Sequence, residues 1–142
     1  MHSVYLTVGT LGPEFASVNL GIGGATVSSC VCEVLGVSRQ RLRQAYKDEG
    51  DLGDVACLFK QSQQTLVPLT PLTVSSTHAK LMKLAEDSGG GSSTRKAAVA
   101  KALIRGCRGP ETRYMVRTLL QVSHSSSHSS FPNQPATCWI TD

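Results

Sequence analysis

Aromatic residues are scarce in this sequence, with 3 Phe, 3 Tyr and 1 Trp among 142 residues. A core must therefore be built mainly from Leu, Val and Ala, a mixture that favours packed helices. Val, Leu, Ile and Phe still form about 24% of the chain, above the roughly 20% typical of disordered sequences. The alternation typical of strands appears only briefly, over Val4–Val8. The composition predicts an all-α fold, and the length suits one domain.

Long apolar runs are also lacking. The uncharged stretch at residues 15–32 is interrupted by Gly21, Gly23 and Gly24, whereas a membrane-spanning helix needs about 18 apolar residues in succession. The first thirteen residues lack the basic and apolar segments of a secretory signal. The 5 cysteines are odd in number and unpatterned, and Cys30-Val-Cys32 lacks zinc-site spacing. We therefore expect no membrane contact, and reduced thiols in an intracellular chain.

Capping residues and glycines predict where helices begin and end. Six starts are expected, at Gly24, Ser38, Asp51, Thr73, Ser93 or Thr94, and Gly109. Spacings of three and four predict the residues that face the core, which are Val27, Val31, Val34, Leu35, Leu42, Ala45, Tyr46, Leu52, Val55, Ala56, Phe59, Val74, His78, Leu81, Ala85, Ala100, Leu103, Ile104, Cys107, Met115, Val116 and Leu119. The Pro68–Pro71 stretch is a non-helical connection. Residues 1–121 are thus expected to form the helical domain, and the Ser/His-rich residues 122–142 a disordered tail.

The net charge of +4 is concentrated in one segment. Residues 88–121 carry seven Lys or Arg against Glu111 alone, whereas residues 1–87 and 122–142 each carry a net −1. Such a concentration is typical of proteins that contact a phosphate backbone. A solvated helical face is the alternative interpretation.

A glycine-rich loop precedes the most basic helix. Gly89, Gly90 and Gly91 lead into a helix with Arg95 and Lys96 in its first turn. The free N–H groups and dipole of a helix N-terminus attract anions, and cations there are unfavourable unless an anion accompanies them. A bound phosphate would explain the arrangement, and a flexible connection is the alternative. The spacing is not that of a Walker A motif.

Further basic residues follow at helical spacing. Lys101, Arg105 and Arg108 are expected on one face of the same helix, and Arg113 and Arg117 on one face of the next. Two basic helices suit contact with the backbone of duplex DNA. Few aromatic residues are interleaved, which disfavours stacking on single-stranded bases.

Catalytic patterns are weak. Cys57 and His78 could form a nucleophile and base, but both fall on apolar helical faces typical of core residues. His124, His128 and Cys138 could bind a metal only from the expected tail. The acids at positions 48, 49, 51 and 54 flank a glycine turn and a helix start, where capping is enough to explain them.

An ordered series of motifs resembles the N-terminal DNA-binding domain of ATP-dependent DNA ligases, closest to the eukaryotic DNA ligase I type. The resemblance spans about residues 3–121. It rests on Tyr5-Leu6, Leu11-Gly-Pro13, Leu20-Gly-Ile-Gly23, Glu49-Gly-Asp-Leu-Gly53, Pro71-Leu-Thr73, Gly90-Gly-Ser-Ser93, Arg95-Lys96, Cys107-Arg108 and Arg113-Tyr-Met-Val-Arg-Thr-Leu119.

The resemblance implies a helical domain that grips the minor groove of nicked duplex DNA together with two further ligase domains. The Gly/Ser loop and its basic pair would approach phosphates. With the charge pattern, it gives the expected DNA-binding residues, which are Gly90, Gly91, Ser92, Ser93, Arg95, Lys96, Lys101, Arg105, Arg108, Arg113 and Arg117. It also implies a role in DNA replication, repair and recombination, with a nuclear or other intracellular location.

The sequence departs from the family in three places. The family's helices before Tyr5 are missing, and the Ser/His segment replaces an Arg-x-Arg turn expected near Gln121. The Lys-x-Asp-Gly motif of the adenylation domain is absent, since Lys47-Asp-Glu-Gly50 has Glu49 at its third position. We therefore expect a partial DNA-binding domain without ligation chemistry of its own. ATP and Mg²⁺ are expected only for a full-length ligase.

Two alternatives remain open at this level. A non-catalytic helical protein-interaction module would expose apolar faces left by missing neighbours, at Val27, Val31 and Leu35 and at Met115 and Leu119. A thiol enzyme would need a depressed pKa at Cys57 or Cys107.

Overall fold

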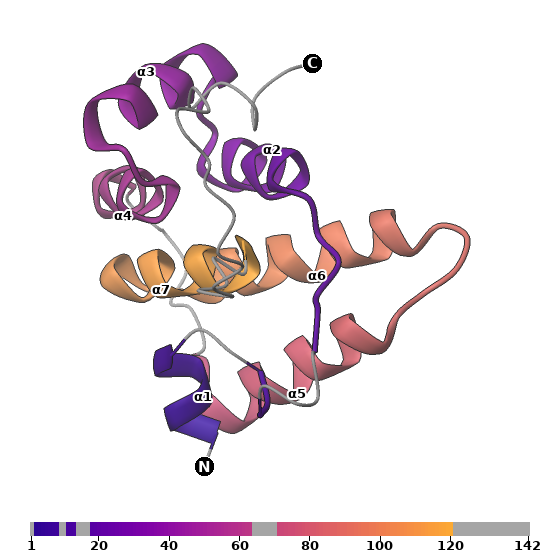
Figure 1. The fold of residues 1–142 in the computed structure, drawn as a ribbon. Coiled ribbons are helices and arrows are strands. Elements are labelled where there is room, and N and C mark those ends of the chain that lie inside the picture. The colour runs from indigo at the N-terminus through magenta and orange to yellow at the C-terminus, as the bar shows by residue number, and fades with distance from the viewer. Residues whose placement is uncertain (1, 9–10, 14–17, 64–70, 121–142) are drawn as a thin grey trace, which may run out of the picture.

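The computed structural model describes residues 2–8, 11–13, 18–63 and 71–120, and every regular element in these ranges is a helix. The helices are α1 (His2–Val8), α2 (Gly24–Leu35), α3 (Arg39–Glu49), α4 (Leu52–Ser62), α5 (Val74–Glu86), α6 (Ser92–Gly106) and α7 (Gly109–Leu120) (Figure 1). The predicted all-α fold is confirmed. The predicted tail at 122–142 and positions 68–70 of the proline connection lie outside the described residues.

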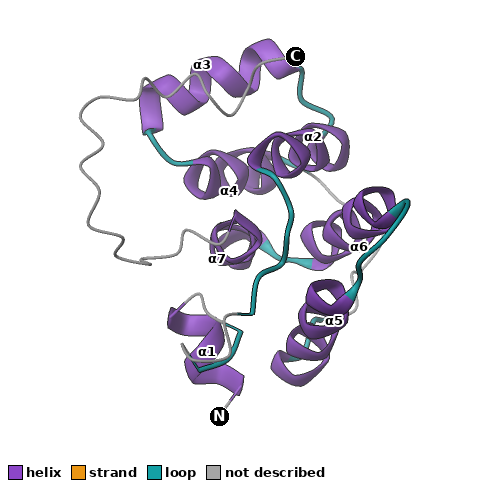
Figure 2. Cartoon of the chain, turned by 45° about the vertical axis from the view of Figure 1, so that its right-hand side comes forward, coloured by secondary structure: helices purple, strands orange, loops and turns teal. Residues whose placement is uncertain are grey.

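The brief alternation at Val4–Val8 does not form a strand. These residues lie in α1, which packs against α5 (Figure 2). The Tyr5 ring lies 6.5 Å from the His78 ring, centroid to centroid. Five alternating residues are too few to decide between helix and strand, so contact with a neighbouring element can decide it.

Most predicted helix ends are confirmed by their caps. The side chains of Ser38, Asp51 and Thr73 accept hydrogen bonds from backbone amides in the first turns of α3, α4 and α5. Gly36 and Gly50 end α2 and α3 in the left-handed conformation, with φ of 65° and 77°.

The start of α6 differs from the sequence prediction. The helix begins at Ser92, not at Ser93 or Thr94, and its N-cap is Gly91, whose φ of 76° is in the left-handed region. No side chain caps this end. The glycine-rich turn leads directly into the helix, so no serine or threonine occupies the capping position.

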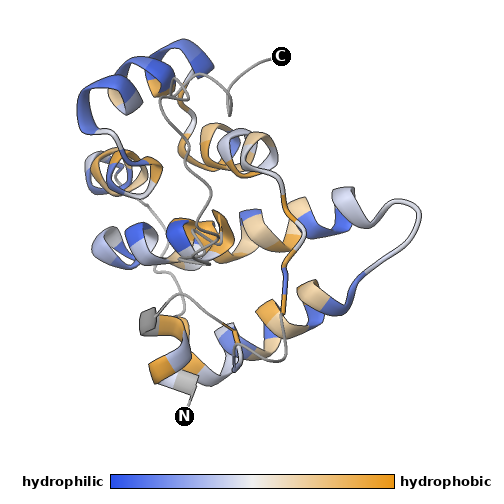
Figure 3. Ribbon diagram, in the orientation of Figure 1, coloured by the Kyte–Doolittle hydropathy of each residue, from blue (hydrophilic) through white to orange (hydrophobic). Residues whose placement is uncertain are grey.

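The core lies where α2, α4, α6 and α7 meet, with α4 packed along α7 and α2 packed on α6. Its fully buried side chains include Leu20, Val31, Ile104 and Leu119. By contrast α3 is largely hydrophilic (Figure 3), and Leu42 is its one buried residue. The predicted inward faces of α2, α4, α6 and α7 are therefore confirmed in outline.

The inward face of α5 is rotated from the predicted one. Val74 is 47% exposed, whereas Thr77, Leu81 and Leu84 are buried. Because α5 packs against both α1 and α6, its buried stripe is set by two neighbours. The part of the chain that the structure describes holds no helix long and apolar enough to cross a bilayer.

Candidate nucleic-acid interface

The expected phosphate loop lies at the tip of a hairpin formed by α5 and α6, and it projects beyond the neighbouring helices (Figure 1). Residues 88–91 are exposed. Gly89 and Gly91 have φ of 96° and 76°, which favour glycine. The Ser92 amide donates to the Gly89 carbonyl at 3.2 Å, so the turn closes tightly against the start of α6.

This helix start offers unused donors. Among the described residues, none accepts a hydrogen bond from the amides of Ser93 and Thr94, which belong to the first turn of α6. The first amides of a helix have no partner within it, and they carry the positive end of its dipole. The tip of the hairpin therefore presents N–H groups that an anion can accept.

A groove of about 300 Å³ lies between α5 and α6 beside this tip. Its charged lining residues are Lys80 and Lys83 from α5, Arg95 and Lys96 from α6, and Asp87 after α5. Lys80 and Lys83 are exposed, and no described residue bonds to their ammonium groups. The charge pattern of the sequence did not indicate these two lysines, because they precede the loop and lie outside the basic segment at 88–121.

Arg95 does not project freely into solvent. Its Nε and Nη2 donate to the Asp87 carboxylate at 3.0 and 2.6 Å, and its Nη1 donates to the Gly90 carbonyl at 3.2 Å. The hydrogen bond from Arg95 lowers the pKa of Asp87 and correspondingly raises the pKa of Arg95. The guanidinium is therefore held against the loop by an acid from the opposite side of the hairpin.

Lys96 is buried, with 8% of the residue exposed. Its Nζ donates to the Leu20 carbonyl oxygen at 2.7 Å, and a Cβ added at Gly21 would lie 3.0 Å from that nitrogen. A buried ammonium is costly unless it is hydrogen-bonded. Lys96 thus connects the first turn of α6 to the Leu20-Gly-Ile-Gly23 turn by a hydrogen bond. No spacing in the sequence indicates this contact.

Lys96→Met is expected to reduce the free energy of unfolding by about 1.5 kcal/mol, because it leaves the Leu20 carbonyl without its charged donor. Urea denaturation measures the change. The exposed Lys83→Met serves as the control, with an expected change within about 0.5 kcal/mol. Equal stabilities of the two variants would contradict a structural role for Lys96.

The predicted stripe of Lys101, Arg105 and Arg108 is not continuous on one helix. Helix α6 ends at Gly106, so Arg108 lies in the connection to α7, where its amide donates to Glu111 Oε2 at 2.9 Å. Lys101 is ion-paired with Glu33 of α2. The side chains of Arg105 and Arg108 are exposed. The prediction of one continuous face was wrong because α6 ends before Cys107 and Arg108, so helical spacing no longer applies there.

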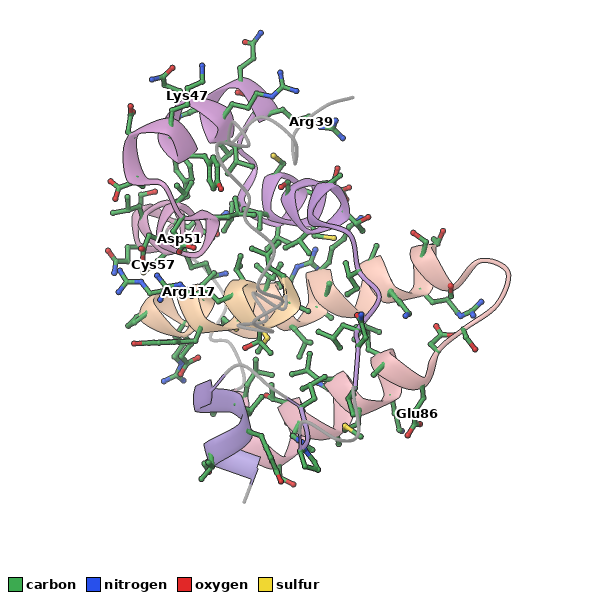
Figure 4. The ribbon with its side chains drawn as sticks, in the orientation of Figure 1. Arg39, Lys47, Asp51, Cys57, Glu86 and Arg117 are labelled. Atoms are coloured by element: carbon green, nitrogen blue, oxygen red, sulfur yellow. The ribbon has the colours of Figure 1, made fainter. Side chains whose placement is uncertain are left out.

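Arg113 and Arg117 face α4 acids. Arg113 is ion-paired with Asp54, and Arg117 lies 3.1 Å from both the Asp51 and the Asp54 carboxylates. Figure 4 shows Arg117 beside Asp51, away from the α5–α6 tip. Asp51 caps α4 as expected, but its second role as an arginine partner was missed. The spacing of three between Asp51 and Asp54 and of four between Arg113 and Arg117 could have indicated that the two pairs face each other.

The weaker chemical candidates are engaged elsewhere. Cys57 is buried and accepts a hydrogen bond from Gln61, whereas His78 Nε2 lies 3.0 Å from the Leu11 carbonyl oxygen. Burial raises the pKa of Cys107 to about 12, which opposes thiolate formation. The described residues contain no group of three His, Cys, Asp or Glu side chains that could hold a metal ion.

The lysine of Lys47-Asp-Glu-Gly50 is on the exposed last turn of α3, and Gly50 is the C-cap of that helix. The Gly50 amide donates to the Tyr46 carbonyl at 2.9 Å. The tetrapeptide therefore ends a helix, as expected, and does not resemble the setting of the Lys-x-Asp-Gly lysine that forms a bond to the nucleotide.

Comparison with known proteins agrees with the motif series. The family described as "DNA ligase N terminus" matches residues 1–124. The chain is 39% identical to DNA ligase 6 of Arabidopsis thaliana over 119 residues, 84% of the chain and 8% of that protein. It is 35% identical to DNA ligase 1 of Schizosaccharomyces pombe over 116 residues, 82% of the chain and 15% of that protein.

A third relative, DNA ligase 1 of Saccharomyces cerevisiae, is 31% identical over 118 residues, 82% of the chain and 16% of that protein. The chain thus spans no more than about a sixth of these relatives' lengths. The resemblance carried by the glycine turns and the Pro-Leu-Thr helix start is confirmed. The chain belongs to the N-terminal domain family of ATP-dependent DNA ligases.

Proposed function

We propose that this chain binds the phosphate backbone of duplex DNA through the tip and groove of the α5–α6 hairpin. The observation that carries the proposal is a groove lined by the exposed Lys80, Lys83 and Arg95, beside the unpaired amides of the α6 first turn. Backbone amides and cations together are the usual partners of phosphate oxygens. DNA is also the substrate that membership of a DNA ligase family implies.

The structure divides the expected DNA-binding residues into separate groups. In the proposed complex Gly90–Ser93 contribute backbone and hydroxyl donors, and the exposed Arg105 and Arg108 add charge farther along. Lys80 and Lys83 join them as phosphate contacts, while Lys96 positions the helix. Lys101, Arg113 and Arg117 contribute only if they leave their acidic partners.

Nicked duplex is the proposed form of the DNA, because a ligase seals nicks. The chain would bind the DNA and would not catalyse ligation. ATP and Mg²⁺ would be used by other domains of a full-length ligase. Action in replication, repair and recombination in the nucleus belongs to the same proposal.

Binding of duplex DNA is expected to weaken steeply as salt rises from 50 to 200 mM. Lys80→Gln with Lys83→Gln should weaken binding about tenfold and reduce the slope of log affinity against log salt by about 2, since two phosphate contacts are lost. Fluorescence anisotropy with a labelled nicked duplex measures both quantities.

The matched control is Arg43→Gln with Lys47→Gln, which removes the same charge from exposed positions on α3. Lys47 lies on the far side of the molecule from the hairpin (Figure 4). An affinity that does not depend on salt, or an equal loss in the control, would contradict the proposed surface.

The alternative of a protein-interaction module depended on exposed apolar helix faces, and these faces are buried. Val27, Val31, Leu35 and Leu119 are at most 5% exposed and Met115 is half-buried against the core, so the expectation that these residues would be uncovered is wrong. They are covered because α2 packs on α6 and α7 packs along α4, all within this chain.

A further inference from the structure

Asp87 is the one acid among the residues that line the α5–α6 groove. It lies directly after α5, and its carboxylate takes both the Nε and the Nη2 hydrogens of Arg95. With Nη1 bonded to the Gly90 carbonyl, all three guanidinium nitrogens have a partner inside the hairpin. The Arg95 guanidinium is therefore already hydrogen-bonded when a phosphate approaches the groove.

The occupied geometry is the one that a phosphate would use. The guanidinium fork binds a carboxylate or a phosphate through two parallel hydrogen bonds, so the two anions compete for the same face. The Asp87 carboxylate is charged at neutral pH, as an ordinary aspartate is, and the hydrogen bond from Arg95 lowers its pKa further. The charged Asp87 carboxylate therefore competes with DNA phosphates for Arg95 at neutral pH.

The pair is exposed enough to open. The Arg95 side chain is 54% exposed and that of Asp87 is 26% exposed. Exposed ion pairs are weak, and a multiply charged ligand can displace them. The glycines at 89–91 allow the loop between the two residues to adjust.

We propose that Asp87 is a built-in counter-ion that occupies Arg95 and lowers the affinity of the α5–α6 groove for the phosphates of duplex DNA. On binding, a phosphate oxygen replaces the carboxylate at the guanidinium, and the freed carboxylate turns to solvent. The need to displace the carboxylate lowers the affinity of the groove for phosphate, although all of its cations remain.

The test compares Asp87→Asn with Glu86→Gln in the full chain. Both variants remove one negative charge from the end of α5. Glu86 is exposed and lies outside the groove lining, whereas Asp87 lines the groove. For nicked duplex, Asp87→Asn is expected to tighten binding about fivefold, the upper range for releasing an exposed ion pair. The slope of log affinity against log salt should change by less than about 0.9, because Arg95 contacts a phosphate in both complexes and only the competing carboxylate is lost. Glu86→Gln should change affinity less than twofold.

A second arm uses inorganic phosphate, because the role of Asp87 rests on the proposed function and must be separable from it. The amide resonances of Ser93 and Thr94 report phosphate binding. Half-saturation is expected at about fivefold lower phosphate concentration in Asp87→Asn than in Glu86→Gln. Arg95→Ala in the Asp87→Asn background should abolish the gain with either ligand.

Equal phosphate affinities of the two variants, or weaker binding by Asp87→Asn, would overturn the counter-ion role. The latter result would mean that Asp87 holds Arg95 in place for the ligand. A phosphate gain without any salt-sensitive duplex binding would support the counter-ion and overturn the proposed function instead.

Discussion

Gly53→Ala is expected to lower the free energy of unfolding by about 3 kcal/mol. Gly53 is buried in the first turn of α4, where that helix crosses α7. A Cβ at this position would lie 2.8 Å from the Arg113 carbonyl oxygen, 2.9 Å from Asp51 Oδ2 and 3.1 Å from Arg117 Cγ. The first of these atoms is backbone and cannot move unless α7 moves.

The cost extends beyond the clash. The same crossing holds the ion pairs that Arg113 and Arg117 make with Asp51 and Asp54. A shift of α7 away from α4 would lengthen them, so an added methyl group is expected to weaken packing and pairing together.

Thermal and urea denaturation of Gly53→Ala measure the effect. Gly23→Ala is the control, because Gly23 has a φ of −71° and nothing lies within 4 Å of the added Cβ. That control is expected to change stability by less than about 0.5 kcal/mol. Near-native stability of Gly53→Ala would show that α4 and α7 are not packed this closely.

Leu119→Ala is expected to cost about 4 kcal/mol, the larger of the two effects. The Leu119 side chain is fully buried and belongs to the central cluster with residues of α2, α4 and α6. Its truncation removes apolar contacts and leaves a cavity that helices from several directions cannot easily close.

The control is Leu58→Ala on α4, since Leu58 is 49% exposed. Its loss is expected to stay below about 1 kcal/mol. Chemical denaturation of the two variants separates core from surface. Similar losses would contradict the buried position of Leu119, which the sequence predicts as an inward-facing residue.

Local features of this fold were predictable because the interactions that set them span three or four residues. Ser38, Asp51 and Thr73 begin helices through hydrogen bonds to amides three positions on. Gly36 and Gly50 end helices because glycine readily adopts a positive φ. The start of α6 was misplaced because a glycine occupied the cap that a serine or threonine usually fills.

The candidate site was only partly predictable. The glycine-rich loop and its basic surroundings were visible as composition and charge. Charge alone could not tell Lys96, buried against Leu20, from Lys83, exposed beside the groove. It also could not show that Arg95 is held by Asp87.

The sequence by itself determined the helices from α2 to α7, most of their ends, the family and the segment that carries the positive charge, but not α1. Each of these depends on residue type and short spacing, which are present before any long-range contact forms. Only the tertiary structure decided which cations are available to a ligand. That depends on partners such as Leu20 for Lys96 and Asp51 for Arg117, which lie 76 and 66 positions away along the chain. The approach of such distant segments is fixed by core packing, and no local pattern encodes it.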